Sequence, residues 1–243
     1  MGFRSVSEYA AADEAGQTWV TSFRKTVASA ATTTNAWIDY TYFAGSPTAN
    51  FYASEPLVSA VVDSARGIYV PSVAPATQHL RNLMLMSAAS AATSTTNGRQ
   101  QVCLSDYLLY YPFIDTDAVG EQQDLTNSVA IPRYTSGQVM AVAQSAASTV
   151  GQFTFTYTNQ DGVGGRVSQN AFTCAVAGGG QIVAASGAGA SYNPFLYLQA
   201  GDSSVRSIES VTFTAGGGGL MALVIVKPLL KSVITQECRR TTS

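Results

Sequence analysis

The fold is decided by the stretch Phe153-Thr154-Phe155-Thr156-Tyr157-Thr158. Aromatic residues alternate here with threonines. Because successive side chains of a β-strand point to opposite faces, one face of this segment is wholly apolar and the other is a row of hydroxyls. The turn residues Asn159-Gln160-Asp161-Gly162 follow directly. The pattern predicts a half-buried strand of an antiparallel sheet.

Comparable apolar or β-branched runs, separated by turn residues, recur after Gly67. The run Leu220–Val226 is continuously apolar, which predicts a strand buried on both faces. Nine such strands fit two packed sheets, so we expect a mainly β fold, a jelly-roll-like antiparallel β-sandwich. The strands are expected at His79–Ser87, Val102–Pro112, Val139–Gln144, Gln152–Asn159, Ala171–Ala177, Gln181–Ala185, Phe195–Gln199, Ser207–Thr214 and Leu220–Lys227.

The N-terminal region has a different pattern. Ser5-Val6-Ser7-Glu8 is a capping box, in which Ser5 accepts from the Glu8 amide while the Glu8 side chain reaches back, and Gly16 is a C-terminal stop. The helix between them has little apolar area, so we expect it to be stable only when it docks on something. Residues 1–65 are therefore predicted to be an N-terminal arm, partly helical, and residues 66–243 the sandwich domain.

Three further segments carry local predictions. Pro56–Val62 fits either two helical turns or a strand. The glycine runs Gly178–Gly180 and Gly216–Gly219 lie between expected strands and lack the Lys-Ser/Thr of a phosphate loop. We therefore expect both runs to be flexible hairpin loops without a ligand.

The composition is unusually poor in charge. Charged residues make up 12% of the 243 residues and hydrophobic residues 46%, whereas a typical soluble domain has about 25% charged residues. Between Tyr134 and Ala200 the only charged side chains are Asp161 and Arg166. Burying Ser, Thr or Ala in an interface costs less side-chain entropy and desolvation than burying Lys or Glu. This composition favours a subunit that is covered by other proteins.

Several partner classes are not expected. The net charge of −2 and the absence of a basic stripe argue against nucleic acid. No apolar run reaches the length of a membrane span, and no signal peptide is recognisable at the start. Three cysteines without CxxC spacing, Cys103, Cys174 and Cys238, suit a chain made in a reducing cytoplasm. The tail is the one basic region, with Lys227, Lys231, Arg239 and Arg240 against Glu237.

No catalytic, cofactor-binding or metal site is predicted, and the chain is not expected to be an enzyme. The acidic segment Asp115–Glu121 resembles a calcium loop, but Val119 and Thr126 occupy positions where an EF-hand needs oxygen ligands. The single histidine, His79, has no neighbouring Cys–His set for zinc and no Gly-x-Ser-x-Gly elbow for a serine triad. The simpler interpretations are a solvated loop and a structural imidazole.

Two sets of side chains allow both a functional and a structural interpretation. Tyr107, Tyr110 and Tyr111 could form an aromatic platform that stacks sugars, or they could belong to the sandwich core and a subunit contact. Arginines beside turns could bind carboxylates across an interface or brace local loops; they are Arg133, Arg166 and Arg206. We expect the structural role in both sets.

A resemblance to a known group rests on seven short motifs between about residues 66 and 229. They are Gly67-Ile68-Tyr69, Pro75-Ala76-Thr77-Gln78-His79-Leu80, Asp106-Tyr107-Leu108-Leu109-Tyr110-Tyr111-Pro112, Ile131-Pro132-Arg133-Tyr134, Tyr157-Thr158-Asn159-Gln160-Asp161-Gly162, Gly201-Asp202-Ser203-Ser204-Val205-Arg206-Ser207 and Val226-Lys227-Pro228-Leu229. The chain resembles virion structural proteins encoded in the head modules of tailed bacteriophages.

The resemblance implies a capsid cement or decoration protein, located on the capsid surface of the virion and made in the host cytoplasm. Its partners would be the major capsid protein and further copies of itself, with a trimer as one form of homo-oligomer, and no catalytic residues transfer. Two alternatives remain open. One is another phage structural component, in the tail, a fibre or the capsid shell, and the other is a carbohydrate-binding β-sandwich module.

Overall fold

The computed structural model describes residues 4–26, 37–69, 80, 83–84, 100–146, 151–168, 172–174, 178–183 and 193–234. Contacts divide the chain into two compact units. The first unit combines residues 1–22, 69–104 and 229–243, and the second combines residues 23–68 and 105–228. Residues 23–65, expected to belong to the N-terminal arm, thus group with most of the sandwich strands.

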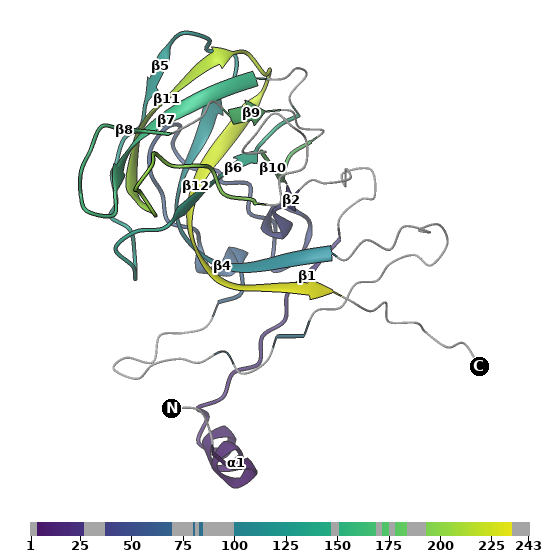
Figure 1. The fold of residues 1–243 in the computed structure, drawn as a ribbon. Coiled ribbons are helices and arrows are strands. Elements are labelled where there is room, and N and C mark those ends of the chain that lie inside the picture. Colours follow the sequence, from purple (N-terminus) through teal and green to yellow (C-terminus); the bar gives the residue numbers. More distant parts are fainter. Residues whose placement is uncertain are drawn as a thin grey trace. The chain divides into compact units, whose positions relative to one another are not determined.

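The second unit is built from two facing antiparallel sheets (Figure 1). The order of the first sheet is β2 (Trp37–Ile38), β10 (Gln181–Ile182), β6 (Gln138–Ala143), β12 (Leu220–Ile234) and β4 (Gln100–Asp115). The order of the second is β5 (Gln122–Asp124), β11 (Val205–Ala215), β7 (Gly151–Asn159) and β8 (Arg166–Val167), with β9 (Phe172–Cys174) also paired to β7. The expected mainly β, sandwich-like fold is confirmed.

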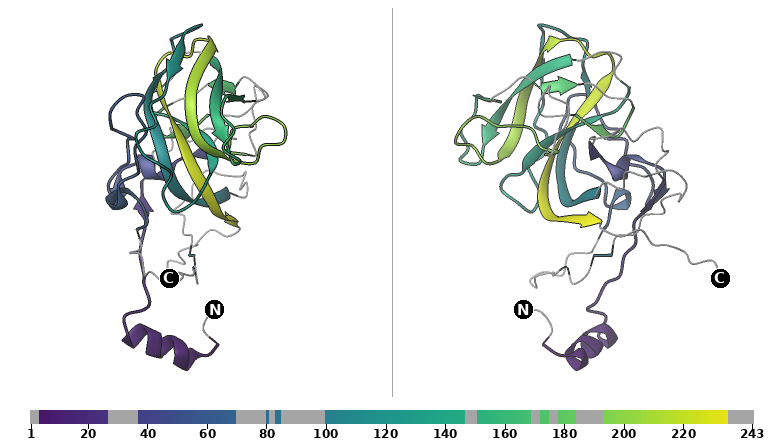
Figure 2. Two further views of the ribbon diagram at one scale, coloured as in Figure 1. Left: turned by 90° about the vertical axis from the view of Figure 1, so that its left-hand side faces the viewer. Right: turned by 45° about the vertical axis from the view of Figure 1, so that its right-hand side comes forward.

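The core lies between the two sheets and follows the period of two. On β7 the buried apolar side chains are Phe153, Phe155 and Tyr157, as the alternating stretch predicts. The Phe153 ring lies 5.1 Å from that of Phe213 on the neighbouring β11. From the opposite sheet, Met221, Leu223 and Ile225 of β12 enter the same cluster. Figure 2 shows the two layers from the side.

The first sheet is buried on its other face as well. Ala222, Val224 and Val226 of β12 are fully buried although they point away from the core between the sheets. The segment that follows β2 packs on this sheet, where Tyr52 contacts Tyr110 of β4 at a ring distance of 5.2 Å. The two-sided burial predicted for Leu220–Val226 is confirmed for Met221–Val226, whereas Leu220 is exposed.

Most expected strands are present, and their bounds differ in instructive ways. β4 and β12 are longer than expected, and β10 ends before Val183. Of the expected strand Ala171–Ala177 the structure describes only β9, and of Gln181–Ala185 it describes residues 181–183. The predicted strand Phe195–Gln199 is wrong, because this segment is irregular although Phe195 and Leu196 are buried. Most of His79–Ser87 lies outside the described residues, and positions 80, 83 and 84 are not in a strand. Pro56–Val62 is neither helix nor strand but forms isolated bridges to Thr126 and Tyr110.

Both glycine runs carry the chain from one sheet to the other, so the hairpin prediction is wrong. Gly178–Gly180 joins β9 to β10, and Gly216–Gly219 joins β11 to β12. A Cβ on Gly179 would lie 2.7 Å from the ring of Tyr42, and Gly180 has a φ of +83°. Glycine is required here by close packing and a left-handed backbone.

The described helical part of the first unit is α1 (Val6–Glu14). The Ser5 hydroxyl accepts from the Glu8 amide at 3.1 Å, as the capping box predicts, while the Glu8 carboxylate accepts from the amide of Arg4. Gly16, with φ +67°, follows the end of the helix. Within α1 only Ala12 is buried.

The second unit also contains short elements outside the two large sheets. They are the 3₁₀ turns η2 (Tyr40–Tyr42) and η3 (Ser64–Arg66) and a two-stranded sheet of β1 (Arg24–Lys25) and β3 (Gly45–Ser46).

Candidate functional site

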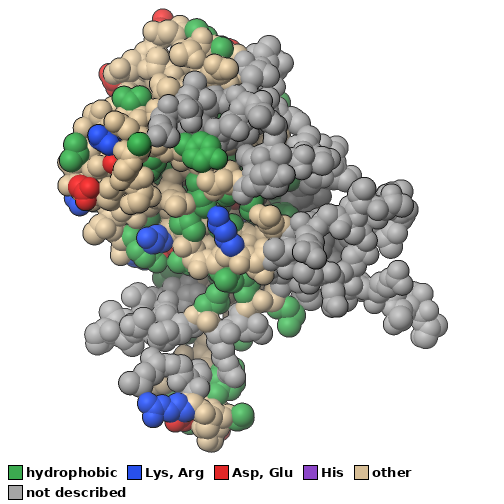
Figure 3. Space-filling model, in the orientation of Figure 1, with side chains coloured by type: hydrophobic (Ala, Val, Ile, Leu, Met, Phe, Trp, Pro, Cys, Tyr) green, Lys and Arg blue, Asp and Glu red, His purple; other side chains and the backbone are tan. Residues whose placement is uncertain are grey.

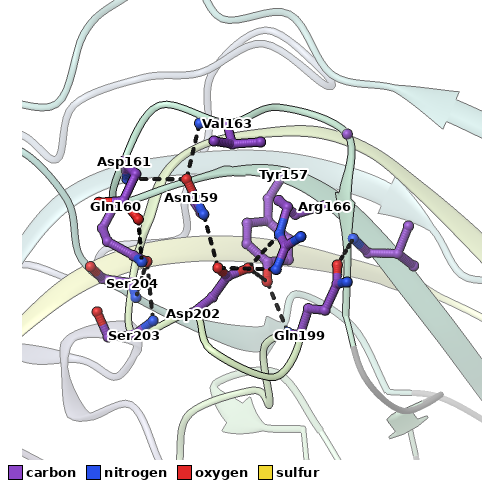
Figure 4. Close-up of polar contacts among 12 residues, drawn as sticks. Tyr157, Asn159, Gln160, Asp161, Val163, Arg166, Gln199, Asp202, Ser203 and Ser204 are labelled. Atoms are coloured by element: carbon purple, nitrogen blue, oxygen red, sulfur yellow. Dashed lines mark hydrogen bonds and ion pairs between the residues drawn. The ribbon is translucent and has the colours of Figure 1, made fainter.

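The densest polar cluster of the described residues surrounds Asp202 in the loop before β11 (Figure 4). Its carboxylate accepts from Arg166 Nε at 2.9 Å and Nη2 at 3.3 Å, from the Tyr157 hydroxyl at 2.6 Å and from Asn159 Nδ2 at 2.8 Å. The side chain of Asp202 is only 2% exposed. Four donors therefore occupy both carboxylate oxygens.

The protonation states follow from these contacts. Hydrogen bonds from Arg166, Tyr157 and Asn159 lower the pKa of Asp202 to about 2, against the effect of desolvation. Burial and the neighbouring carboxylate raise the pKa of Tyr157 to about 12. A general acid or base works best with a pKa near the operating pH. Near neutral pH Asp202 stays ionised and Tyr157 stays protonated, so neither group is suited to transferring protons. The pair is suited to holding the loop and the strand together.

The cluster extends into the adjoining turns. Asn159 Oδ1 accepts from the amides of Asp161 and Val163 at 3.0 Å each, which closes the turn after β7. The Gln160 carbonyl accepts two hydrogen bonds from Arg206, at 2.9 and 2.6 Å. The predicted turn at Asn159–Gly162 is thus tied to β11 and to the loop before it.

A second buried carboxylate, Asp39, lies just after β2. It accepts from the backbone and hydroxyl of Thr41 at 2.9 and 2.8 Å, from Tyr107 of β4 at 2.9 Å, and from the hydroxyl of Tyr52. Burial raises the pKa of Asp39, while these hydrogen bonds act in the opposite direction. The cluster attaches the segment after β2 to β4. Neither Asp39 nor Asp202 was singled out from the sequence, although Asp39-Tyr40-Thr41 has the spacing of an Asx turn.

The tyrosines proposed as a sugar platform take structural positions. Tyr111 is fully buried, and its hydroxyl donates to Asn127 at 2.5 Å and accepts from the Ile208 amide at 3.1 Å. Tyr110 is 7% exposed and packs on Tyr52. Tyr107 donates to Asp39. Since these side chains do not share an open face, the core interpretation is the one that the structure supports.

The acidic segment also serves the fold. The Asp115 carboxylate accepts from the amide of Asp117 at 2.9 Å, and the Asp117 carboxylate accepts from the amide of Gly218 at 2.8 Å. The segment therefore holds the glycine run that crosses between the sheets. In the part of the chain that the structure describes, no group of three His, Cys, Asp or Glu side chains is arranged for a metal ion. His79 lies outside that part.

The three arginines all have partners within the chain. Arg133 binds Asp106 through Nε at 3.0 Å and Nη2 at 2.6 Å, and Nη2 also donates to the carbonyl of Tyr107. Arg166 and Arg206 belong to the cluster around Asp202 and its turn. The predicted role as local braces is confirmed for each.

One shallow pocket of about 140 Å³ adjoins the Asp202 loop. Its lining includes Gln138, Asn193, Tyr197 and Ser203, and Tyr197 is 44% exposed. The volume is well below the roughly 300 Å³ at which ligand pockets usually begin. Within the described residues, no helix has the length and apolarity of a membrane span.

The described polar clusters thus join strands, turns and loops of one sandwich, and their charged side chains already have internal partners. Comparison of the chain with protein-family models, with curated proteins and with solved structures finds no match.

Proposed function

We propose that this chain is a non-enzymatic structural subunit of a virion, a capsid cement or decoration protein. It binds the major capsid protein of the shell and neighbouring copies of itself, and it stabilises the particle by adding buried contact area. The resemblance of its motifs to those of head-module proteins of tailed bacteriophages is the reason for proposing the shell as the partner.

The observation that carries the proposal is the number of large apolar side chains exposed in the first unit. Isolated exposed apolar residues are normal, but a concentration of them indicates an interaction surface. Val6 is 83% exposed, Val20 93% and Met84 71%. The others of this set are Trp19, Tyr69, Leu80, Leu229 and Leu230.

The surface of the second unit supports the same role. On the face drawn in Figure 3 the charged side chains are few and are scattered among neutral ones. The outward side of β7 carries Thr154, Thr156 and Thr158, and Thr212 of β11 lies opposite Thr154. Hydroxyl rows of this kind lose little side-chain entropy when another protein covers them.

The proposal is tested with the purified full chain. Light scattering gives its mass in solution, and the chain is then mixed with shells that lack it. We expect an oligomer that binds in a fixed number of copies matching the symmetry of the shell. A chain that ignores shells at saturating concentration contradicts the proposal and favours a tail, fibre or glycan-binding role.

A further inference from the structure

The N-terminal arm, defined as residues 4–22, is almost entirely exposed. In this arm only Ala12 is buried, and all but three side chains are exposed. A nine-residue helix is marginal in water without tertiary contacts. Beyond α1, Trp19 and Val20 are also exposed. Docking of the arm would therefore remove apolar area that the chain itself leaves in water.

The far half of β12 is the complementary feature. β6 pairs with β12 only from Met221 to Val226, so within the described strands the following residues have β4 as their one neighbour. A two-stranded ribbon is marginally stable on its own. Because side chains alternate along a strand, Lys227, Leu229 and Lys231 share one face. Leu229 is 54% exposed, and both lysines are exposed.

The two features also match in charge. The arm carries three carboxylates, Glu8, Asp13 and Glu14, against the single guanidinium of Arg4. The β12 segment 227–234 carries two lysines and no acidic residue. Self-pairing of this β12 face would bring lysines together, which is unfavourable, whereas an acidic apolar segment suits it. Complementary charge selects the partner, and apolar contact supplies most of the affinity.

We propose that the arm of one copy docks on the Lys227–Leu229–Lys231 face of β12 in a neighbouring copy. This inference rests on the proposed function, because it assumes that copies meet, and it names the surfaces through which they do. The contact joins two different surfaces, so reciprocal exchange closes a dimer and head-to-tail exchange closes a ring such as a trimer.

The first test measures self-association of the full chain by sedimentation. We expect Val20→Asn and Leu229→Asn each to raise the dissociation constant at least about tenfold, which corresponds to about 1.4 kcal/mol. The matched control is Val163→Asn, since Val163 is 53% exposed in the second unit, and it should change the constant less than about twofold. Far-UV circular dichroism checks that each variant keeps its strands. Equal effects of all three substitutions overturn the inference.

The second test places a photo-crosslinking residue at position 20 in a mixture of ¹⁴N- and ¹⁵N-labelled chains. We expect mixed-isotope crosslinks to the peptide that contains Leu229 and Lys231. Crosslinks confined to one isotope, or a chain that stays monomeric, overturn the inference. Shell binding is measured separately, so arm exchange and the cement role can fail independently.

Discussion

Replacing Tyr111 by phenylalanine separates a core tyrosine from a ligand-binding one. The ring stays in place, but the hydroxyl that donates to Asn127 and accepts from the Ile208 amide is lost. Burial raises the pKa of Tyr111 to about 12, so this hydroxyl is protonated near neutral pH. Since Ile208 is fully buried, its amide is left without this acceptor, at a cost of about 1–3 kcal/mol.

The matched control is Tyr110→Phe in the same strand. Tyr110 makes a ring contact with Tyr52 that phenylalanine keeps, and its hydroxyl has no hydrogen bond to a described residue. We expect a change within about 0.5 kcal/mol. For a chain of this size about 1 kcal/mol shifts the melting temperature by roughly 2–4 °C. Tyr111→Phe should therefore melt several degrees below the wild type and the control.

The assay is thermal unfolding followed by circular dichroism, with urea unfolding as a second measure. Equal melting temperatures of Tyr111→Phe and Tyr110→Phe would refute the reasoning about the buried hydroxyl. A sugar array adds a direct check on the glycan alternative. If the wild type binds a sugar and either variant loses this binding while it keeps its fold, the tyrosines bind a ligand.

Three further predictions concern the braces and the surface. Asp202→Asn should destabilise the chain at neutral pH. The pKa of Asp202 lies near 2 in the folded chain, below the value of about 4 in the unfolded chain. The stability that the ionised carboxylate contributes is therefore lost as the pH falls from about 4 to 2, and the difference in unfolding free energy between wild type and variant should shrink over this range. A difference that persists in full at pH 2 contradicts this role of Asp202. Gly219→Ala should lower the free energy of unfolding by about 1–3 kcal/mol, because the φ of Gly219 is +115° and a Cβ would lie 2.6 Å from Ser145 Oγ. The control Gly67→Ala should leave stability almost unchanged, because a Cβ on Gly67 would meet open space. Equal urea midpoints of the two variants would contradict this prediction. Attachment to shells should depend weakly on salt, since few ion pairs are available to be screened; release at moderate salt, measured by sedimentation, argues against an apolar contact.

The sequence was informative where burial follows a period. The alternation at Phe153–Thr158 predicted the observed alternate burial, and the continuous apolar run at Leu220–Val226 predicted the burial of Met221–Val226. Failures occurred where tertiary context decides. Phe195–Gln199 is apolar enough for a strand, but the segment is an irregular loop from which Phe195 and Leu196 are buried. The short strands β5 and β8 have no apolar alternation, and they form because β11 and β7 offer them partners.

The polar clusters were harder to predict than the strands. Asp202 meets Arg166 and Tyr157 across 36 and 45 positions of sequence, and no local spacing encodes such a meeting. The sequence could, however, predict which polar residues close turns. Turn residues such as Asn159 and Asp161 mark the places where side chains close loops, and the structure shows Asn159 doing so with the amides of Asp161 and Val163.

The scarcity of charge has a structural counterpart in how the remaining charges are used. Arg133 binds Asp106, Arg166 binds Asp202, and Glu209 accepts from Thr158 and the amide of Gly165. Charges used in this way brace the sandwich and are poorly placed to bind a partner. Under the proposed function, contact with other proteins therefore falls mainly to neutral and apolar side chains. Affinity for such contacts grows with the number of copies that bind together, which is the condition that a repetitive shell provides.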